Sequence, residues 1–94
     1  MKIHLHFFAT YRELVGHRNL TLDVDEGCDV QTVAEMFLEA NPHMRQHWLD
    51  QAGFWMPHVF VILNKQDVNS LPDGYKTILQ PGDELDFLPP VGGG

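Results

Sequence analysis

The residues best suited to chemistry are the last three of the 94-residue sequence, Gly92, Gly93 and Gly94. Glycine has no Cβ, so a tail built from it can be slender, extended and conformationally free. Pro89 and Pro90 come shortly before it, and prolines fix φ and lack N–H donors, which stiffens the exit from a preceding strand. The pattern favours a tail that threads a narrow channel and presents its terminal carboxyl group for reaction. A frayed end or a linker remnant is the alternative.

Two apolar residues, Phe8 and Leu88, fall on the expected outward faces of alternating segments, 2–9 and 84–88. If these segments form neighbouring strands, the two side chains make an exposed apolar spot near the start of the tail. Such clusters often mark partner-binding sites. Isolated surface apolar residues are common, however, so their types alone do not decide the matter.

Hydrophobic spacing predicts the elements that must position these groups. Alternation at 2–9 and 20–24, with a turn at 16–19, predicts an opening antiparallel hairpin. Asp29 is a predicted helix N-cap. An apolar stripe follows it at helical spacing, formed by Val30, Val33, Ala34, Phe37 and Leu38. Asn41-Pro42 should end this helix.

The second half of the chain is less regular. Residues 43–57 are the hardest to interpret, with a short helix predicted around 44–49. Residues 58–64 form a buried-strand candidate whose two faces cannot be assigned. In the last strand, Leu85 and Phe87 should point inward.

These elements predict an α+β fold, with one main helix across one face of a mixed sheet. We expect a single domain over residues 1–88, followed by a flexible tail over residues 89–94.

Composition excludes several classes of protein. Six basic against 13 acidic residues give a net charge of −7, which argues against nucleic-acid binding and against a basic membrane-surface helix. The longest strongly apolar run, 59–63, is too short to span a bilayer. The single cysteine, Cys28, excludes an internal disulfide and suits a reducing compartment, so we expect a cytoplasmic protein.

Other candidate groups favour structural or surface roles. The pairs His4/His6 and His43/His47 have metal-ligand spacing but no evident third ligand. Cys28 has acidic neighbours that should blunt its nucleophilicity. We therefore predict no metal site and no catalytic side chain.

Two longer stretches resemble a known family. FFATYRELVG at 7–16 and PGDELDFLPPVGGG at 81–94 are similar to the MoaD/ThiS family of ubiquitin-like sulfur carriers, which includes the small archaeal modifier proteins. The likeness is closer to MoaD than to ThiS and covers nearly the whole chain apart from 43–57. It implies a ubiquitin-like β-grasp fold with a C-terminal Gly-Gly tail.

The resemblance also implies a function. An E1-like, MoeB-type enzyme would adenylate the Gly94 carboxylate with ATP and Mg²⁺, and a sulfur donor would convert it to a thiocarboxylate. As the non-catalytic small subunit of molybdopterin synthase, the chain would insert its tail into the large subunit. No cofactor is expected to be bound. The implied site comprises Gly94, the tail residues Gly92 and Gly93, and the partner contacts Phe8, Leu88, Pro89, Pro90 and Val91.

Two other functions stay open. A lysine amine could attack the activated Gly94, which would make the chain a ubiquitin-like protein modifier of the small archaeal type. Alternatively, the chain could be a passive β-grasp interaction module. The sequence does not separate these functions, nor molybdopterin, tungstopterin, thiamine and tRNA as destinations of the sulfur.

Overall fold

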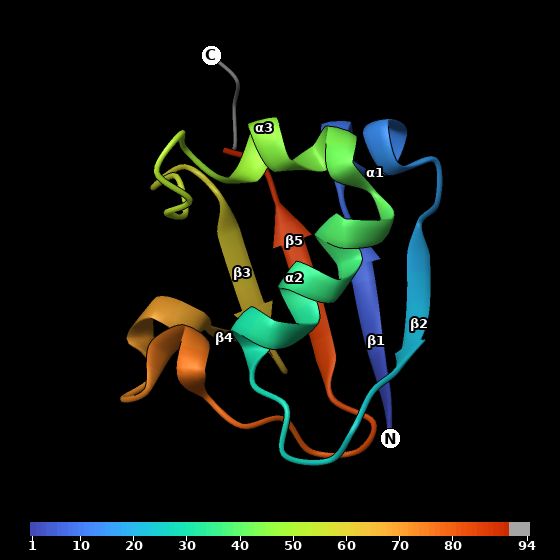
Figure 1. The fold of residues 1–94 in the computed structure, drawn as a ribbon, viewed down its shortest axis with the longest axis vertical. Helices are drawn as coiled ribbons and strands as arrows, with labels where there is room; N and C mark the ends of the chain where they lie inside the picture. Colours follow the sequence, from blue (N-terminus) through green and yellow to red (C-terminus); the bar gives the residue numbers. More distant parts are fainter. Residues whose placement is uncertain (91–94) are drawn as a thin grey trace.

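The computed structural model describes residues 1–90, which form one five-stranded mixed sheet with helices on its inner face (Figure 1). The strand order is β2-β1-β5-β3-β4. In chain order the strands are β1 (Lys2–Phe7), β2 (Asn19–Asp23), β3 (Phe60–Leu63), β4 (Gln66–Asp67) and β5 (Glu84–Leu88). The central pair, β1 and β5, is parallel, whereas the other neighbours are antiparallel. The predicted mixed sheet is therefore confirmed.

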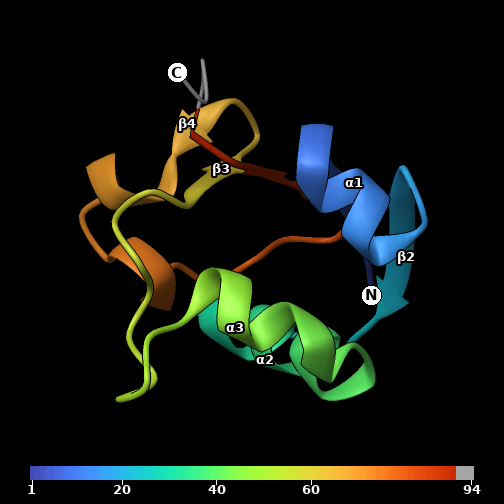
Figure 2. The ribbon, with the colours of Figure 1, turned by 90° about the horizontal axis from the view of Figure 1, so that it is seen from above.

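The main helix, α2 (Val30–Ala40), crosses the inner face of the sheet, as Figure 2 shows from above. Asp29 caps it as predicted, because its carboxylate accepts a 2.7 Å hydrogen bond from the Thr32 backbone N–H. All members of the predicted stripe are buried. The helix ends at Ala40, before Asn41-Pro42, which also agrees with the prediction.

The connection between the first two strands differs from the prediction. The strands do pair antiparallel, but a seven-residue helix, α1 (Ala9–Val15), replaces the simple loop. Strand β1 ends at Phe7 rather than continuing to Ala9, because Ala9 takes a left-handed φ of 52° and begins the helix. Gly16 ends α1 with φ 86°, a conformation that glycine adopts without a Cβ clash. The helix is anchored by the buried ring of Tyr11.

Residues 43–57 supply the centre of the core. After a 3₁₀ turn (Pro42–Met44), the short helix α3 (Arg45–Trp48) places Trp48 fully inside the protein. The Trp48 ring stacks on Phe87, with ring centroids 4.5 Å apart, and also contacts Phe37 at 5.3 Å. The short helix was predicted, but the role of its tryptophan was not.

Two further 3₁₀ turns, Val68–Ser70 and Gly74–Lys76, connect β4 to the last strand. In β5, Leu85 and Phe87 are buried as predicted. The sheet thus has an apolar inner face against α2 and α3, and an outer face that no helix covers within residues 1–90 (Figure 2).

Candidate functional site

The outer face of the sheet has an apolar cluster near the end of β5. Phe87 is in register with Phe7 on β1, and the Phe8 backbone N–H donates a 3.2 Å hydrogen bond to the Phe87 carbonyl. Phe8 keeps an extended backbone (φ −119°, ψ 151°), so its side chain points outward although β1 has ended. It therefore lies beside Leu88, and the two predicted contact residues are neighbours.

Phe60 completes this cluster. It lies opposite Leu88 in the antiparallel β3–β5 pair. Phe8 is 41% exposed, Phe60 is 40% exposed, and Leu88 is half-buried. We call Phe8, Phe60 and Leu88 the apolar triad.

The sequence does not mark Phe60 as an outward residue, because the run 58–64 is largely apolar and its two faces cannot be told apart. The structure assigns its faces: Val61 and Leu63 are buried, whereas Phe60 and Ile62 alternate with them and point outward. Strand register is the signal that identifies Phe60, because residues directly opposite each other in a sheet share a face, and a strand antiparallel to β5 must place an outward residue opposite Leu88.

Polar and charged side chains border the triad on one side. Together with Phe8 they line a hollow of about 210 Å³, formed with His6, Asn64, Lys65, Glu84 and Asp86. Nε2 of His6 donates a 3.0 Å hydrogen bond to Glu84 Oε1. An apolar centre with a polar margin is the usual composition of a protein–protein contact surface.

Asp86 is the perturbed acid of this surface. Partial burial raises the pKa of Asp86, and Glu84 also raises it, whereas His6 and Lys65 act in the opposite direction. Ionisation of Asp86 beside the triad therefore costs more free energy than ionisation of a fully solvated aspartate.

The tail begins directly beside the triad. Pro89 is half-buried and Pro90 is exposed, and both follow Leu88 at the end of β5. The other predicted tail residues, Val91 and Gly92, Gly93 and Gly94, lie outside the described residues. The triad and the first tail residues are therefore adjacent, as the sequence predicted for Phe8 and Leu88.

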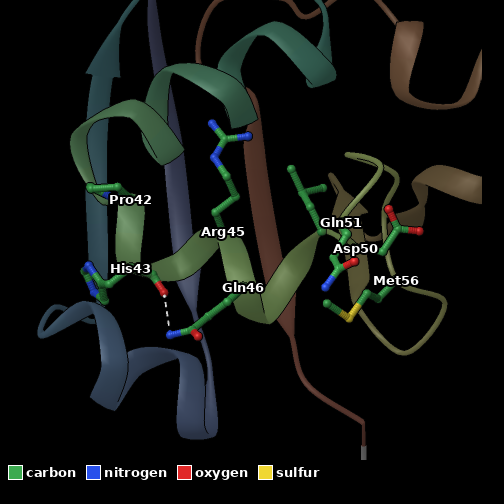
Figure 3. Close-up of a pocket in the computed structure, with 8 residues that line it drawn as sticks. Pro42, His43, Arg45, Gln46, Asp50, Gln51 and Met56 are labelled. Atoms are coloured by element: carbon green, nitrogen blue, oxygen red, sulfur yellow. Dashed lines mark hydrogen bonds between the residues drawn. The ribbon is translucent and has the colours of Figure 1, made fainter.

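A larger open hollow, of about 740 Å³, lies along the 3₁₀ turn and α3 (Figure 3). Its rim includes His43, whose Nε2 donates a 2.9 Å hydrogen bond to the Leu14 carbonyl, and Arg45, which pairs with Glu35 at 3.1 Å. These two contacts connect the 3₁₀ turn to α1 and α3 to α2.

Both histidines of the other predicted pair are also hydrogen-bonded. His4 is hydrogen-bonded to Thr21 Oγ1 at 3.0 Å, and His6 to Glu84. Among residues 1–90, no cluster of three or more His, Cys, Asp or Glu side chains could hold a metal ion. Over the same residues, no helix is long and apolar enough to cross a membrane.

A mixed sheet with a parallel central strand pair and a main helix across one face is the ubiquitin-like β-grasp architecture. Comparison with known proteins agrees. The ThiS family matches residues 5–94. The chain is 39% identical over 94 residues to Small archaeal modifier protein 3 of Haloferax volcanii, covering both chains completely.

Solved structures show the same fold. The crystal structure of SAMP1 from Haloferax volcanii matches with a TM-score of 0.88 and 26% identity over 100% of both chains. The solution structure of Urm1 from Trypanosoma brucei matches with a TM-score of 0.77 at 21% identity, over 99% of this chain and 95% of that one, which shows the fold alone. The chain therefore belongs to the ThiS family, whose members are small ubiquitin-like carriers and modifiers.

Proposed function

We propose that the chain is a ubiquitin-like protein modifier, joined through the carboxyl group of Gly94 to lysine side chains of other proteins. The observation that supports this most directly is the 39% identity, along the full length of both chains, to a protein named as a small archaeal modifier. The triple glycine at the end of the sequence supplies the acyl group.

The chemistry needs an external activating enzyme, because a carboxylate is a poor electrophile. In the proposed reaction a Gly94 carboxylate oxygen attacks the α-phosphate of ATP, with Mg²⁺ present, and pyrophosphate leaves. A lysine amine then attacks the acyl carbon, AMP leaves, and the amine loses a proton to give an isopeptide bond. The catalytic side chains belong to the activating enzyme and its conjugation partners.

In this proposal the apolar triad is the surface that the E1-like enzyme contacts, together with Pro89, Pro90 and Val91. The supporting geometry is the adjacency of Leu88, an outward apolar residue, to the start of the tail. A partner bound to Phe8 and Phe60 would be close to the start of the tail at Pro89, and the tail ends in the carboxyl group that the partner must bind.

Sulfur transfer is the second candidate, supported by the ThiS-family match over residues 5–94. Here hydrosulfide released by a sulfur donor, rather than a lysine amine, would attack the acyl carbon, AMP would leave, and loss of a proton would give a thiocarboxylate on Gly94. A molybdopterin-synthase large subunit would be the partner if the sulfur serves a molybdenum or tungsten cofactor. The two functions share the activated intermediate and can coexist.

The test is mass spectrometry of the tagged chain from cells that retain the activating enzyme. No Lys or Arg follows Lys76, so trypsin would leave residues 77–94 as a branch on each modified lysine. We expect such branched peptides when deconjugating proteases are inhibited. Their absence under those conditions would overturn the modifier proposal.

Two matched variants separate the alternatives. Deletion of Gly93 and Gly94 should abolish both branched peptides and any thiocarboxylate. A chain with one additional, uncleaved residue after Gly94 should do the same. If these variants retain full biological activity, the chain acts as a passive interaction module. In the wild-type chain, a thiocarboxylate without branched peptides would favour the sulfur-carrier function.

A further inference from the structure

The outer edge of β2 is an open hydrogen-bonding edge. The described sheet ends at β2, and Figure 1 shows no other strand or helix alongside its outer edge. The Phe7 N–H bonds to the Arg18 carbonyl, and the Val24 N–H bonds to the Met1 carbonyl. Hydrogen-bonded and non-hydrogen-bonded pairs alternate along an antiparallel ladder. Residues 18, 20, 22 and 24 therefore direct their N–H and C=O groups toward β1, and the residues between them direct theirs away from it: the outward groups. These are the groups of Asn19, Thr21 and Asp23.

This edge has few of the features that usually protect an edge strand. Protein edges are commonly blunted by proline, bulges or several charges. Strand β2 contains no proline, and Asp23 at its end is its only charged residue. Leu20 and Leu22 on the inner side are only half-buried, so an added strand would cover apolar surface as well as satisfy the backbone.

The sequence around β2 is complementary to itself in antiparallel pairing. If Thr21 lies opposite Thr21 of a second copy, Asn19 lies opposite Asp23, and all these outward-directed groups meet in register. Each pair would then exchange both of its backbone hydrogen bonds. Arg18 directly precedes β2, and Asp25 and Glu26 follow shortly after it, so the basic beginning of one strand would be close to the acidic end of the other.

We propose that β2 pairs with β2 of a second copy of this chain, forming a two-fold symmetric dimer with one continuous sheet. Strands related by a two-fold axis normal to the sheet present the same face on the same side. Both apolar triads would therefore face one side, on the far side of β1 from the interface. Such a dimer offers two partner surfaces at once.

One strand pair buries less than the roughly 1,200 Å² of a stable interface, so we expect a weak dimer with a dissociation constant of about 0.1–1 mM. Both copies have a net charge of −7. Their long-range repulsion is screened at about 0.15 M salt, where the Debye length is about 8 Å. Sedimentation equilibrium and amide NMR of the full chain at that salt concentration are the measurements.

Thr21→Pro is the disrupting variant. The N–H of Thr21 points away from β1, so a proline there removes no hydrogen bond of the existing ladder. In the proposed dimer it removes one donor from each copy and therefore both hydrogen bonds of the Thr21 pair. We expect at least a tenfold weaker association, with the folded state checked by circular dichroism. In the wild type, concentration-dependent amide shifts should concentrate in residues 17–25.

Asn19→Lys provides a test that does not depend on disruption. It would place a lysine opposite Asp23 of the second copy and tighten the dimer severalfold. Asn69→Lys makes the same change at an exposed position beyond β4, the opposite edge of the sheet, and controls for net charge. Only Asn19→Lys should tighten association beyond the effect of reduced repulsion.

Three results would overturn the proposal. The first is a wild-type chain that remains monomeric up to about 1 mM, which would leave the edge to an extended segment of a different protein. The second is a folded Thr21→Pro variant that dimerises like the wild type. The third is an equal response to Asn19→Lys and Asn69→Lys.

Discussion

The two faces of the sheet use aromatic residues in opposite ways. On the inner face, Trp48, Phe87, Phe7 and Phe37 are almost completely buried and contact one another. On the outer face, Phe60 remains 40% exposed, and Phe8, which is 41% exposed, lines a hollow together with charged side chains. Buried rings stabilise the fold, whereas exposed rings are available to a partner. Substitutions on the two faces should therefore affect different measurements.

The largest effect on stability is expected for Trp48→Ala. The side chain is fully buried and contacts four other aromatic rings of the core and Trp55. We expect a loss of about 3–5 kcal/mol in the free energy of unfolding, measured by urea denaturation. Trp48→Phe should lose less, partly because the Trp48 Nε1–H is buried without a hydrogen-bond partner. Equal losses for the two variants would contradict the assigned packing.

Leu85→Ala and Leu88→Ala compare the two faces on a single strand. Leu85 is fully buried, so its truncation should cost about 2–5 kcal/mol. Leu88 is half-buried on the outer face, so its truncation should cost about 1 kcal/mol or less. Urea denaturation of both variants measures the difference. A larger loss at Leu88 would show that the outer face also belongs to the core.

Phe60→Asp should weaken recognition by the activating enzyme and leave the fold largely intact. We expect about a tenfold increase in KM for ATP–pyrophosphate exchange, equivalent to about 1.4 kcal/mol. Phe54→Asp is the matched control, because Phe54 is 70% exposed in the loop between α3 and β3. If both variants raise KM equally, the triad is not the specific contact.

The smallest effect is expected for Asp86→Asn, and it should depend on pH. Burial raises the pKa of Asp86 above its usual value of 3.8, so the folded chain binds this proton more tightly than the unfolded chain does. The contribution of Asp86 to stability therefore falls as pH rises above 3.8. We expect Asp86→Asn to melt slightly higher than the wild type at pH 7.

The difference in melting temperature should disappear below pH 3.8, where Asp86 is protonated in both states. Asp73→Asn, at an exposed acid in the turn before Gly74, is the matched control. Thermal denaturation followed by circular dichroism at both pH values is the measurement. A wild type that is more stable than Asp86→Asn at pH 7 would contradict the assigned cost.

Local pattern explains why much of the fold could be predicted. The Asp29 cap, the apolar stripe of α2 and the inward residues of β5 depend on spacing within one segment. Helix α1 was missed although Gly16 marks its end, because the alternation of residues 2–9 was extended past Phe7 to Ala9. There the chain turns at a left-handed φ, which periodicity does not report.

The candidate site was only partly predictable for the same reason. Phe8 and Leu88 were placed outward by alternation within their own segments. Their contact, and the addition of Phe60, required the pairing of β5 with both β1 and β3. Such pairings join residues that are distant in the sequence, and a uniformly apolar run such as 58–64 does not specify its own register.

By itself, the sequence determined the short-range features: the helix cap, the alternating strands, the acidic charge and the triple glycine on which the proposed carboxyl chemistry rests. The tertiary structure decided that Trp48 fills the core, that three apolar residues from separate segments form one surface, and that β2 is left at an edge. The physical reason is that local features depend on neighbours along the chain. Surfaces and cores instead depend on which distant strands pair and which faces they bury.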